Sequence, residues 1–506
     1  METSERPCIV PTGVATGEIR VSHRSPIRVY GTEKIRNELD STTLIQACNM
    51  RNSPGVEGVV LTPDAHAGYG APIGCVMASP SHIYPGPVGV DVNCSMSLLQ
   101  LNLPAEAIEE KPLRRALIKS ITSRIPVGFA RHAPNGRKIS NELIERALVE
   151  GITDTICQEM NIPQEWICRC EDAVRTGHDG TTDSLGLRLE RIKAQISQGK
   201  SSFKNYEVKI QQIGSYGGGN HFGECEIVRL TEAEKDAAND PEKPNVAKTF
   251  GLIDGNVAFL SHCGSRGFGN ELARAQFTLL KNKFTEWGIP FPGNDPQLVY
   301  APLGTPEADD YLDDVTLGAN FATLNHLIIN SLVLEAFQET IPGITGVLVY
   351  YISHNIARKE IIDGRTLWIH RKGATRAYPA NHFSLKNTPF ARTGHPILLP
   401  GNPQGGSAVM MALEGAKDSY YSINHGAGRA MGRKVAAKTL DQQEVDRDFV
   451  NADILVNCRN YPLDEAPKAY KDFNEVLRSV ELAGLARSVA RLNAKFVIKD
   501  SSRPDD

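Results

Sequence analysis

The chain has 506 residues, of which 41% are hydrophobic and 23% charged, the balance of a globular protein that can bury a large core. A formal net charge of −4 excludes an overall basic surface that wraps nucleic acid, so any such contact would need a local basic cleft. Ten scattered cysteines, an N-terminus (METSERPCIVPTG) without a secretory pattern and the lack of an apolar run of about 18 residues predict a cytoplasmic protein with reduced thiols and no membrane span.

In chain order, the first predicted elements are a short strand, IRVYG, and a helix, EKIRNELDSTTLIQAC, within residues 20–50. Residues 56–102 are rich in Val, Gly and Pro and hold few charges, which indicates buried strands joined by tight glycine turns. Residues 105–200 are charged and have a helical period. The segment 231–246, TEAEKDAANDPEKPNV, is typical of a solvated loop.

The second half of the chain begins with a predicted glycine turn that opens an amphipathic helix, in SHCGSRGFGNELARAQFTLLKNKF. A Pro- and Gly-rich loop region follows over residues 284–315, and residues 310–339 predict one long, largely buried helix. Strands and loops return over residues 346–410. The tail predicts a helix over NEVLRSVELAGLARSVARL and then a strand, KFVIKD. Strands and helices that alternate in this way favour an α/β or α+β fold.

Five of the thirteen histidines lie beside glycines or polar residues in segments of loop-like composition: His221, His262, His354, His370 and His425. A single histidine is more often a hydrogen-bonded structural residue than a ligand. Five in glycine-rich contexts favour a site, because glycine lets the backbone approach a ligand closely and leaves N–H groups free to face it.

The stretch GVDVNCSM places Asp91 and Cys94 in an apolar run, where an unpaired carboxylate would be costly to bury. Together with histidines they form a mixed ligand set that suits zinc, manganese or another divalent ion, and a thiolate can bridge two ions. The alternative is that Cys94 is a small core residue and Asp91 caps a turn. Spacing alone leaves both interpretations open.

Arginines and a lysine accompany many of the glycines, which indicates phosphate binding: Arg266, Arg371, Lys372, Arg376, Arg429 and Arg433. The alternative for each is a solvated surface charge. The chain has no G-x-x-x-x-G-K-[ST] motif and no G-x-S-x-G motif, which excludes a P-loop and a serine-hydrolase elbow. The histidine of NHGAGR, His425, could act as a nucleophile towards phosphorus, as a base or as a ligand.

From about residue 56 to residue 499 the chain resembles the RtcB-type RNA-splicing ligases. The motifs that carry this resemblance occur in the same order: TPDAHAGYGAPIG, GVDVNCSM, GGGNHFGE, SHCGSRGFG, APLGTPEADDYLDDVTLGANFATLNH, SHNIARKE, HRKGATRA, LPGNPQGGS, HGAGR and AYKD…VIKD. The resemblance implies an α+β fold with a single compact catalytic domain, whose β-sheets enclose a dinuclear metal site with helices around it. Residues 1–55 would form its N-terminal portion and residues 56–506 the ligase domain, with a helical insertion at about residues 105–200.

The resemblance implies a ligase that depends on GTP and on two Mn²⁺ ions. It would join RNA 3′-phosphate or 2′,3′-cyclic phosphate ends to 5′-hydroxyl ends, through a guanylylated histidine and an RNA-3′-pp-5′-G intermediate. Its partners would be RNA ends and, as in some relatives, an archaease-type activator. Its role would be RNA repair or tRNA splicing.

Position by position, the resemblance assigns His425 as the nucleophile. One metal site would comprise Asp91, Cys94 and His221, and the second Cys94, His262 and His354, with Cys94 as the bridge. Arg266 and Arg433 would hold RNA phosphate. The remaining assignments are guanylate contacts: Asn220, His221, Phe222, Gly223, Glu224, His354, Asn355, Pro400, Gly401, Asn402, Pro403, Ser407, His425, Gly426, Ala427, Gly428 and Lys499.

The chain departs from the family pattern at several positions. Asn93 and Ser95 flank the bridging cysteine where glycines are usual, Pro403-Gln404 replaces Met-Gly, and His326 stands where arginine is usual. These departures favour a divergent branch that repairs broken RNA. The alternative functions are a metal-dependent cyclic phosphodiesterase or phosphohydrolase that acts on RNA ends without ligation, and a non-catalytic protein that binds RNA ends.

Overall fold

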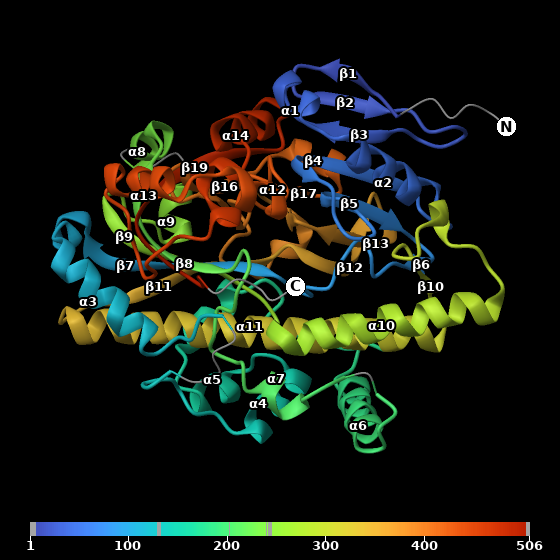
Figure 1. Ribbon diagram of the computed structural model, residues 1–506, viewed down its shortest axis with the longest axis horizontal. Coiled ribbons are helices and arrows are strands. Elements are labelled where there is room, and N and C mark those ends of the chain that lie inside the picture. The colour runs from blue at the N-terminus through green and yellow to red at the C-terminus, as the bar shows by residue number, and fades with distance from the viewer. Residues whose placement is uncertain (1–6, 129–132, 202, 239, 241–244, 502–506) are drawn as a thin grey trace.

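Two large β-sheets form the centre of the protein in the computed structural model (Figure 1), which describes residues 7–128, 133–201, 203–238, 240 and 245–501. The first sheet has the order β1-β2-β3-β4-β5-β13-β12. Its strands are β1 (Ile9–Gly13), β2 (Thr16–Ile19), β3 (Ile27–Tyr30), β4 (Gly58–His66), β5 (Ile73–Ser79), β13 (Arg365–Lys372) and β12 (Asn355–Ile362). Because β3 pairs directly with β4, the N-terminal segment is part of this sheet.

The second sheet has the order β11-β7-β9-β8-β19-β16-β15. A further short strand, β18, also pairs with β19 but is not part of this order. Its strands are β11 (Gly346–Ser353), β7 (Ser95–Pro104), β9 (Asn256–Cys263), β8 (Phe222–Leu230), β19 (Ala486–Lys499), β16 (Gly406–Ala412), β15 (Pro396–Asn402) and β18 (Leu455–Val456). Two short pairs complete the strands: β6 (His82–Ile83) with β10 (Ala301–Pro302), and β14 (Ala374–Arg376) with β17 (Ser422–Asn424).

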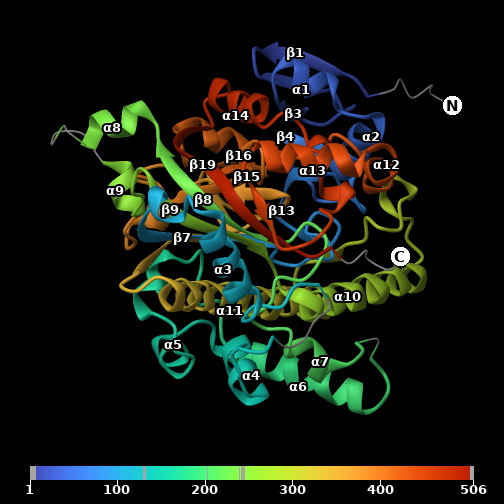
Figure 2. The same cartoon turned by 60° about the vertical axis from the view of Figure 1, so that its left-hand side comes forward.

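Helices cover the sheets on several sides. They are α1 (Glu33–Asn37), α2 (Ser41–Asn52), α3 (Lys111–Thr122), α4 (Asn141–Glu150), α5 (Asp154–Glu159), α6 (Asp183–Ser197), α7 (Tyr206–Ile210), α8 (Glu232–Ala238), α9 (Val246–Phe250), α10 (Arg266–Trp287), α11 (Pro306–Thr340), α12 (Arg433–Thr439), α13 (Gln442–Asn451) and α14 (Phe473–Leu482). Figures 1 and 2 show α10 and α11 side by side beneath the second sheet, with α4 to α7 on the far side of these two helices. The mixed helix-and-sheet class is therefore confirmed.

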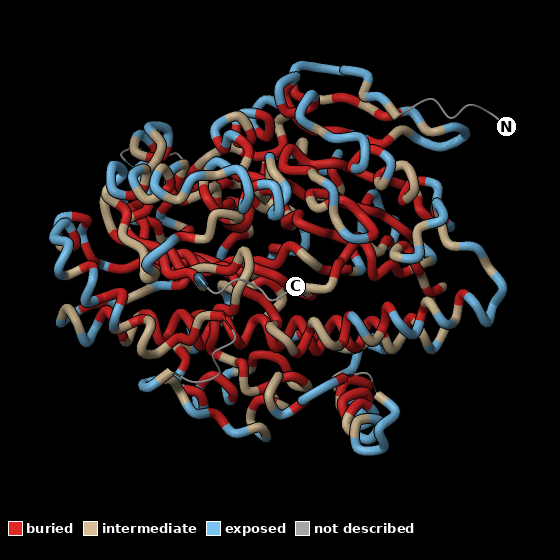
Figure 3. Tube along the Cα trace, viewed as in Figure 1, coloured by how far each residue is buried: buried red, intermediate tan, exposed pale blue. Residues whose placement is uncertain are grey.

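The helix α11 is the core helix predicted over residues 310–339. It starts where the Thr305 hydroxyl accepts a hydrogen bond from the Ala308 N–H at 3.3 Å, with Pro306 in the first position. By length and composition alone it could cross a bilayer, but 94% of its most apolar 18-residue stretch is buried inside the protein. Figure 3 shows it red along most of its length, and it packs against β7 and β9 in the largest hydrophobic cluster.

Other predicted elements are confirmed or corrected. The strand IRVYG, the buried strands of residues 56–102, the helical region 105–200 and the helix that opens after SHCGS are present. The first helix is in fact two, because the Asp40 carboxylate accepts from the Thr43 N–H at 2.9 Å and caps a new helix, α2. The loop of residues 284–315 extends only from α10 to Pro306, and it contains β10.

Two predictions near the second sheet are wrong in part. The segment 231–246 contains the helix α8, which docks through buried Glu234, an ion-pair partner of Arg487 at 2.8 Å; residues 239 and 241–244 lie outside the described residues. The predicted tail helix ends at Leu482, and Gly484 follows with a φ of +69°. The segment from Ala486 is strand β19, because β8 and β16 pair with it on both sides and override its helical propensity.

Candidate metal and nucleotide site

Four neighbouring strands bring the predicted metal ligands to one edge of the second sheet. Cys94 directly precedes β7, His221 precedes β8, His262 lies near the end of β9 and His354 follows β11. In the sheet register Ser95 lies opposite both Cys263 and Ser353, and Phe222 lies opposite His262. Ligands spread over some 260 residues of sequence therefore meet because their strands are adjacent in the sheet.

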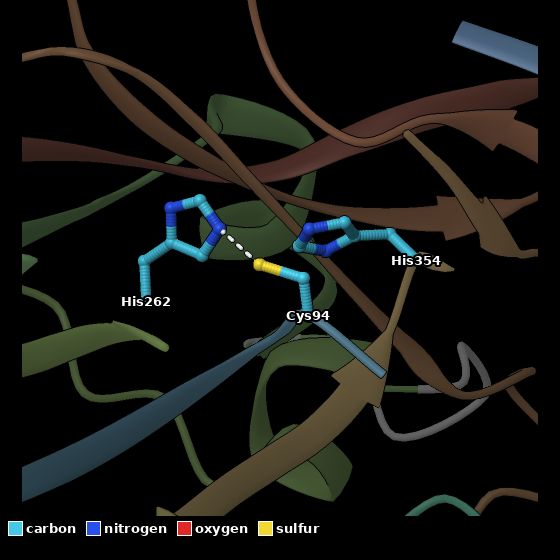
Figure 4. A group of neighbouring side chains, drawn as sticks. All are labelled: Cys94, His262 and His354. Atoms are coloured by element: carbon cyan, nitrogen blue, oxygen red, sulfur yellow. Dashed lines mark hydrogen bonds between the residues drawn. The ribbon is translucent and has the colours of Figure 1, made fainter. Parts of the chain in front are cut away.

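Two groups of donor atoms form at this edge, and they share Cys94. The donor atoms of Cys94, His262 and His354 lie within 4.8 Å of one another, and so do those of Asp91, Cys94 and His221. The Cys94 Sγ lies 3.1 Å from the His262 Nε2, a contact marked by the dashed line in Figure 4, and 3.4 Å from the His221 Nε2. The His221 Nε2 lies 3.0 Å from the Asp91 Oδ2. The predicted division into two sites with a common cysteine agrees with this geometry.

The donor set fits divalent ions. The His221 Nδ1–H donates to the Tyr216 carbonyl at 2.9 Å, which leaves Nε2 free to face Asp91 and Cys94. The His354 Nδ1 is buried without a hydrogen-bond partner in the described part of the chain, as a metal-ligand nitrogen would be. Burial holds the pKa of the Cys94 thiol well above its usual value, and a bound cation would favour the thiolate.

Asn93, where the family pattern has glycine, occupies a left-handed conformation with a φ of +55°. After glycine, asparagine is among the residues that adopt this region most readily, so the departure preserves the turn. The Asn93 Nδ2 donates to the Tyr351 hydroxyl at 2.6 Å, and its N–H donates to the Asn355 carbonyl at 2.8 Å. The Ser95 hydroxyl donates to the Asn93 carbonyl at 2.9 Å. These bonds fix the loop that directs Asp91 and Cys94.

His425 lies beside the donor groups, after β17, with its ring centroid 4.7 Å from that of His354. Its Nδ1–H donates to the Asp64 Oδ2 at 2.7 Å and to the Gly373 carbonyl at 2.9 Å. Asp64 is wholly buried in β4; burial alone would raise its pKa, but the bond from His425 lowers the pKa below its usual value. Because Nδ1 carries the proton, the other ring nitrogen of a neutral His425, Nε2, has a free lone pair.

A cavity of about 320 Å³ opens beside these residues. It is lined by most of the residues predicted for metal and guanylate: Asp91, Cys94, Asn220, Phe222, Glu224, His262, His354, Asn355, Pro400, Gly401, Asn402, Pro403, His425, Gly426, Ala427, Gly428 and Lys499. His221, Gly223 and Ser407 are predicted residues that do not line it. Gly428 has a φ of +72°, and a Cβ there would lie 2.2 Å from the Asp64 carbonyl oxygen, so only glycine fits this turn.

Charged groups face one another at the far end of the cavity. The Lys499 ammonium donates to the Gly219 carbonyl at 2.8 Å and lies 3.4 Å from the Glu465 carboxylate, while burial lowers its pKa. Burial also raises the pKa of Glu224 to about 8, although Lys499 counteracts part of that rise. One carboxyl oxygen of Glu224 has no hydrogen-bond partner among the residues described. The Glu224 carboxyl oxygen is therefore an available hydrogen-bond acceptor at the same end of the cavity as the buried Lys499 ammonium.

The two arginines predicted to hold RNA phosphate lie in different surroundings. Arg433 lines the cavity, and its guanidinium pairs with Asp464 at 2.9 Å and with Glu465 at 2.7 Å. Arg266, at the start of α10, does not line it; its Nε–H donates to the Ser215 hydroxyl at 3.0 Å, and burial lowers its pKa. Their role in binding RNA stays a prediction.

Three other candidates from the sequence are structural. His370 lies inside β13, where its Nε2 accepts from the Tyr84 N–H at 3.0 Å. The Arg371 guanidinium pairs with the buried Glu360 at 2.5 Å, and Arg376 pairs with Glu171 at 2.9 Å. A glycine-rich sequence context alone therefore does not distinguish an arginine in an internal ion pair from an arginine that binds phosphate.

Several polar residues at the site were not identified from the sequence. They are Asp64, which holds His425, and the cavity-lining residues His66, Tyr69, Tyr461, Glu465 and Tyr470. Asp64 and His66 belong to TPDAHAGYG, a motif that signals them by its resemblance to the family. Glu465 lies in a segment without a motif, and only the fold shows that it faces Lys499 and Arg433.

The fold and the site define a mixed helix-and-sheet protein with paired donor groups beside a nucleotide-sized cavity, and comparison with known proteins gives its family. A family model described as "tRNA-splicing ligase RtcB" matches residues 46–500. The chain is similar to proteins named tRNA-splicing ligase RtcB from Pyrobaculum aerophilum (31% identity, 97% of each chain) and Nanoarchaeum equitans (33% identity, 94% of this chain and 95% of the relative). It is also similar to RNA-splicing ligase RtcB of Mycobacterium tuberculosis (32% identity, 88% and 98%). The chain belongs to the RtcB family, as its motifs predict.

Proposed function

We propose that this protein is a GTP- and Mn²⁺-dependent RNA ligase that joins 3′-phosphate or 2′,3′-cyclic phosphate ends to 5′-hydroxyl ends. The names of its relatives supply the reaction class. The observation that carries the proposal is His425, an imidazole held through Nδ1 and positioned beside two donor groups in a cavity. That arrangement suits attack on phosphorus by nitrogen.

His425 acts first. Its Nε2 lone pair attacks the α-phosphorus of GTP, a P–N bond forms, the bond from that phosphorus to the bridging oxygen breaks and pyrophosphate leaves. Asp64 accepts the Nδ1–H bond, so it keeps the reacting nitrogen unprotonated and stabilises the positive charge that develops on the ring. The guanylyl group then passes to the RNA 3′-phosphate, and the 5′-hydroxyl displaces GMP to form the new phosphodiester bond.

The far end of the cavity binds guanine. In its ionised form Glu224 accepts hydrogen bonds from N–H groups on the base, and Lys499 supplies the cation that favours this form. The hairpin from Pro400 to Ser407 and the turn from Gly426 to Gly428 enclose the nucleotide; the Ala427 N–H bond to the Pro400 carbonyl at 3.1 Å holds these two segments together. GTP is a substrate whose base lies away from the donor groups and whose phosphates lie near them.

Two ions, Mn²⁺ by the resemblance, would be held by Asp91, Cys94 and His221 and by Cys94, His262 and His354. When bound, they would neutralise phosphate charge at the reacting phosphorus. Arg433 and Arg266 would contact the phosphate of the RNA. The same proposal includes an archaease-type activator, a cytoplasmic location and a role in RNA repair or tRNA splicing.

The test is a ligation assay with two RNA oligonucleotides, one with a 3′-phosphate and one with a 5′-hydroxyl, in the presence of Mn²⁺ and GTP. We expect joined product with GTP, none without it, and none with His425→Ala. Hydrolysis of a 2′,3′-cyclic phosphate without joining, independent of GTP and of His425, would show a phosphodiesterase and contradict the proposal. Binding of RNA ends without any turnover, unchanged in Cys94→Ala, would show a binding protein.

A further inference from the structure

A second cavity, a groove of about 650 Å³, lies outside the site described above. It is bounded by α3, by α13 and by the segment around β18, which pairs with β19. Its floor is apolar, with Ile118, Phe449, Ile454, Leu455 and Val456. No motif of the family resemblance falls on these residues.

Three cations stand on the walls of this groove: Arg115 and Lys119, one turn apart on α3, and Arg459, which follows β18. All three side chains are exposed, and none has an ion pair or hydrogen bond with any described residue. Lys111, on the same helix, in contrast faces a carboxylate, that of Asp453, at 3.4 Å. Among the described residues that line the groove, Asp446 is the one acidic side chain, so their net charge is positive.

The groove adjoins the catalytic cavity. Tyr461 lines both, and its ring packs on that of Phe449 with centroids 4.6 Å apart. Asn457, on the groove side, accepts through Oδ1 the N–H of Lys499, the predicted guanylate contact, at 2.8 Å. An RNA strand whose end lies in the catalytic cavity could therefore contact unpaired cations on the other side of Tyr461.

We propose that this groove binds the RNA strand that leads into the active site. Its three cations contact the phosphodiester backbone, and its apolar floor contacts the bases. The inference rests on the proposed RNA-ligase function and names where that substrate extends. Free cations at spaced positions above an apolar floor suit a single-stranded polyanion with flat apolar bases.

The test compares two triple variants of equal charge change. The groove variant is Arg115→Ala/Lys119→Ala/Arg459→Ala; the control, Lys359→Ala/Lys386→Ala/Arg392→Ala, removes three exposed cations that line neither cavity. Binding of fluorescent RNA is measured against salt, and KM is measured with short and long oligonucleotides. Lengthening the 3′-phosphate strand or the 5′-hydroxyl strand separately shows which of the two occupies the groove.

We expect the groove variant to bind long RNA about tenfold more weakly at physiological salt, with a salt slope smaller by about 2, the value for three phosphate contacts on a single strand. Ligation of short strands and labelling by GTP should match the wild type. Equal binding of long RNA by the two triple variants would overturn the proposal. Because binding of RNA is measured without GTP, a failure of the ligase assignment would leave this comparison intact.

Discussion

At the scale of single residues, the chemistry depends on contacts between positions that are remote in sequence. Asp64 accepts from both the backbone N–H of His425, at 3.1 Å, and its Nδ1–H, while its other oxygen accepts from the Thr62 hydroxyl at 2.5 Å. Two of these three hydrogen bonds hold His425, and the third, from Thr62, fixes the carboxylate itself. The carboxylate is a positioning group that fixes which ring nitrogen can react.

We predict that Asp64→Asn lowers the rate of His425 guanylylation by about 10²- to 10⁴-fold, because a neutral amide neither fixes the tautomer nor stabilises the charged ring. The rate is measured in single turnover with labelled GTP. Manganese content should be unchanged, since Asp64 belongs to neither donor group. A wild-type rate in a variant that keeps its metal would contradict the positioning role.

Glu226 gives a prediction about stability and pH. It is wholly buried on β8, on the same face as Glu224, and neither carboxyl oxygen has hydrogen-bond geometry to a described residue, although the Ser407 hydroxyl is near enough to favour ionisation. Burial, reinforced by repulsion from Glu224, holds its pKa well above the usual value. Above the unfolded-state pKa of about 4.3, the folded chain therefore binds more protons than the unfolded chain, and stability falls as pH rises.

Since glutamine does not titrate, Glu226→Gln should melt close to the wild type at pH 5 and at a higher temperature than the wild type at pH 8. Differential scanning calorimetry at both pH values measures the gap. The matched control is Glu106→Gln, an exposed side chain, which should give the same small difference at both values. A gap that stays constant with pH would show that Glu226 is ionised throughout.

At the scale of elements, α11 supports the edge of the second sheet where the predicted metal ligands lie. The Ser97 hydroxyl donates to the His326 Nδ1 at 2.7 Å, and the His326 Nε2–H donates to the Cys263 carbonyl at 3.2 Å. Ser97 lies in β7, two residues beyond Ser95, and Cys263 directly follows His262. His326, where the family pattern has arginine, thus joins the helix to the two strands that carry Cys94 and His262.

We predict that His326→Ala weakens manganese binding by about 10- to 100-fold, as loss of a group that holds ligand-bearing strands does. His326→Gln, which keeps a donor and an acceptor, should restore part of the affinity. Equilibrium dialysis followed by metal analysis measures it.

Asn320→Ala serves as the control for His326→Ala. This buried α11 amide donates to the Leu148 carbonyl at 2.8 Å, away from the site, so its loss should lower stability without changing metal affinity. If His326→Ala lowers the melting temperature but binds manganese like the wild type, α11 does not support the metal ligands through His326.

The elements also show where sequence prediction ends. The long helix and the buried strands were predictable because burial all round, or glycine turns between apolar runs, leave a local pattern. The first part of strand β19, residues 486–492, was predicted as helix, because its sequence has helical propensity and its two partners, β8 and β16, are distant in the chain. Its last part, in KFVIKD, was correctly predicted as a strand. Local pattern cannot report a pairing with remote strands.

At the scale of the whole molecule, the site draws on segments from His66 to Lys499, which the fold brings to one cavity. Many residues in family motifs could be assigned from the sequence because each motif keeps its chemistry in a short stretch, although Asp64 and His66 were not. Glu465 and the groove cations Arg115, Lys119 and Arg459 could not, because their meaning depends on which remote residues face them. Arg371 and Arg376 illustrate the converse, since motif arginines proved to be internal ion pairs.

The most direct test of the central claim is covalent labelling of the chain by GTP. The purified protein is incubated with Mn²⁺ and GTP labelled at the α-phosphate, and the labelled peptide is identified. We predict a single acid-labile label on His425, absent from His425→Ala and present in the groove variant. A wild-type chain without label, or a His425→Ala variant labelled to the same extent, would contradict the account.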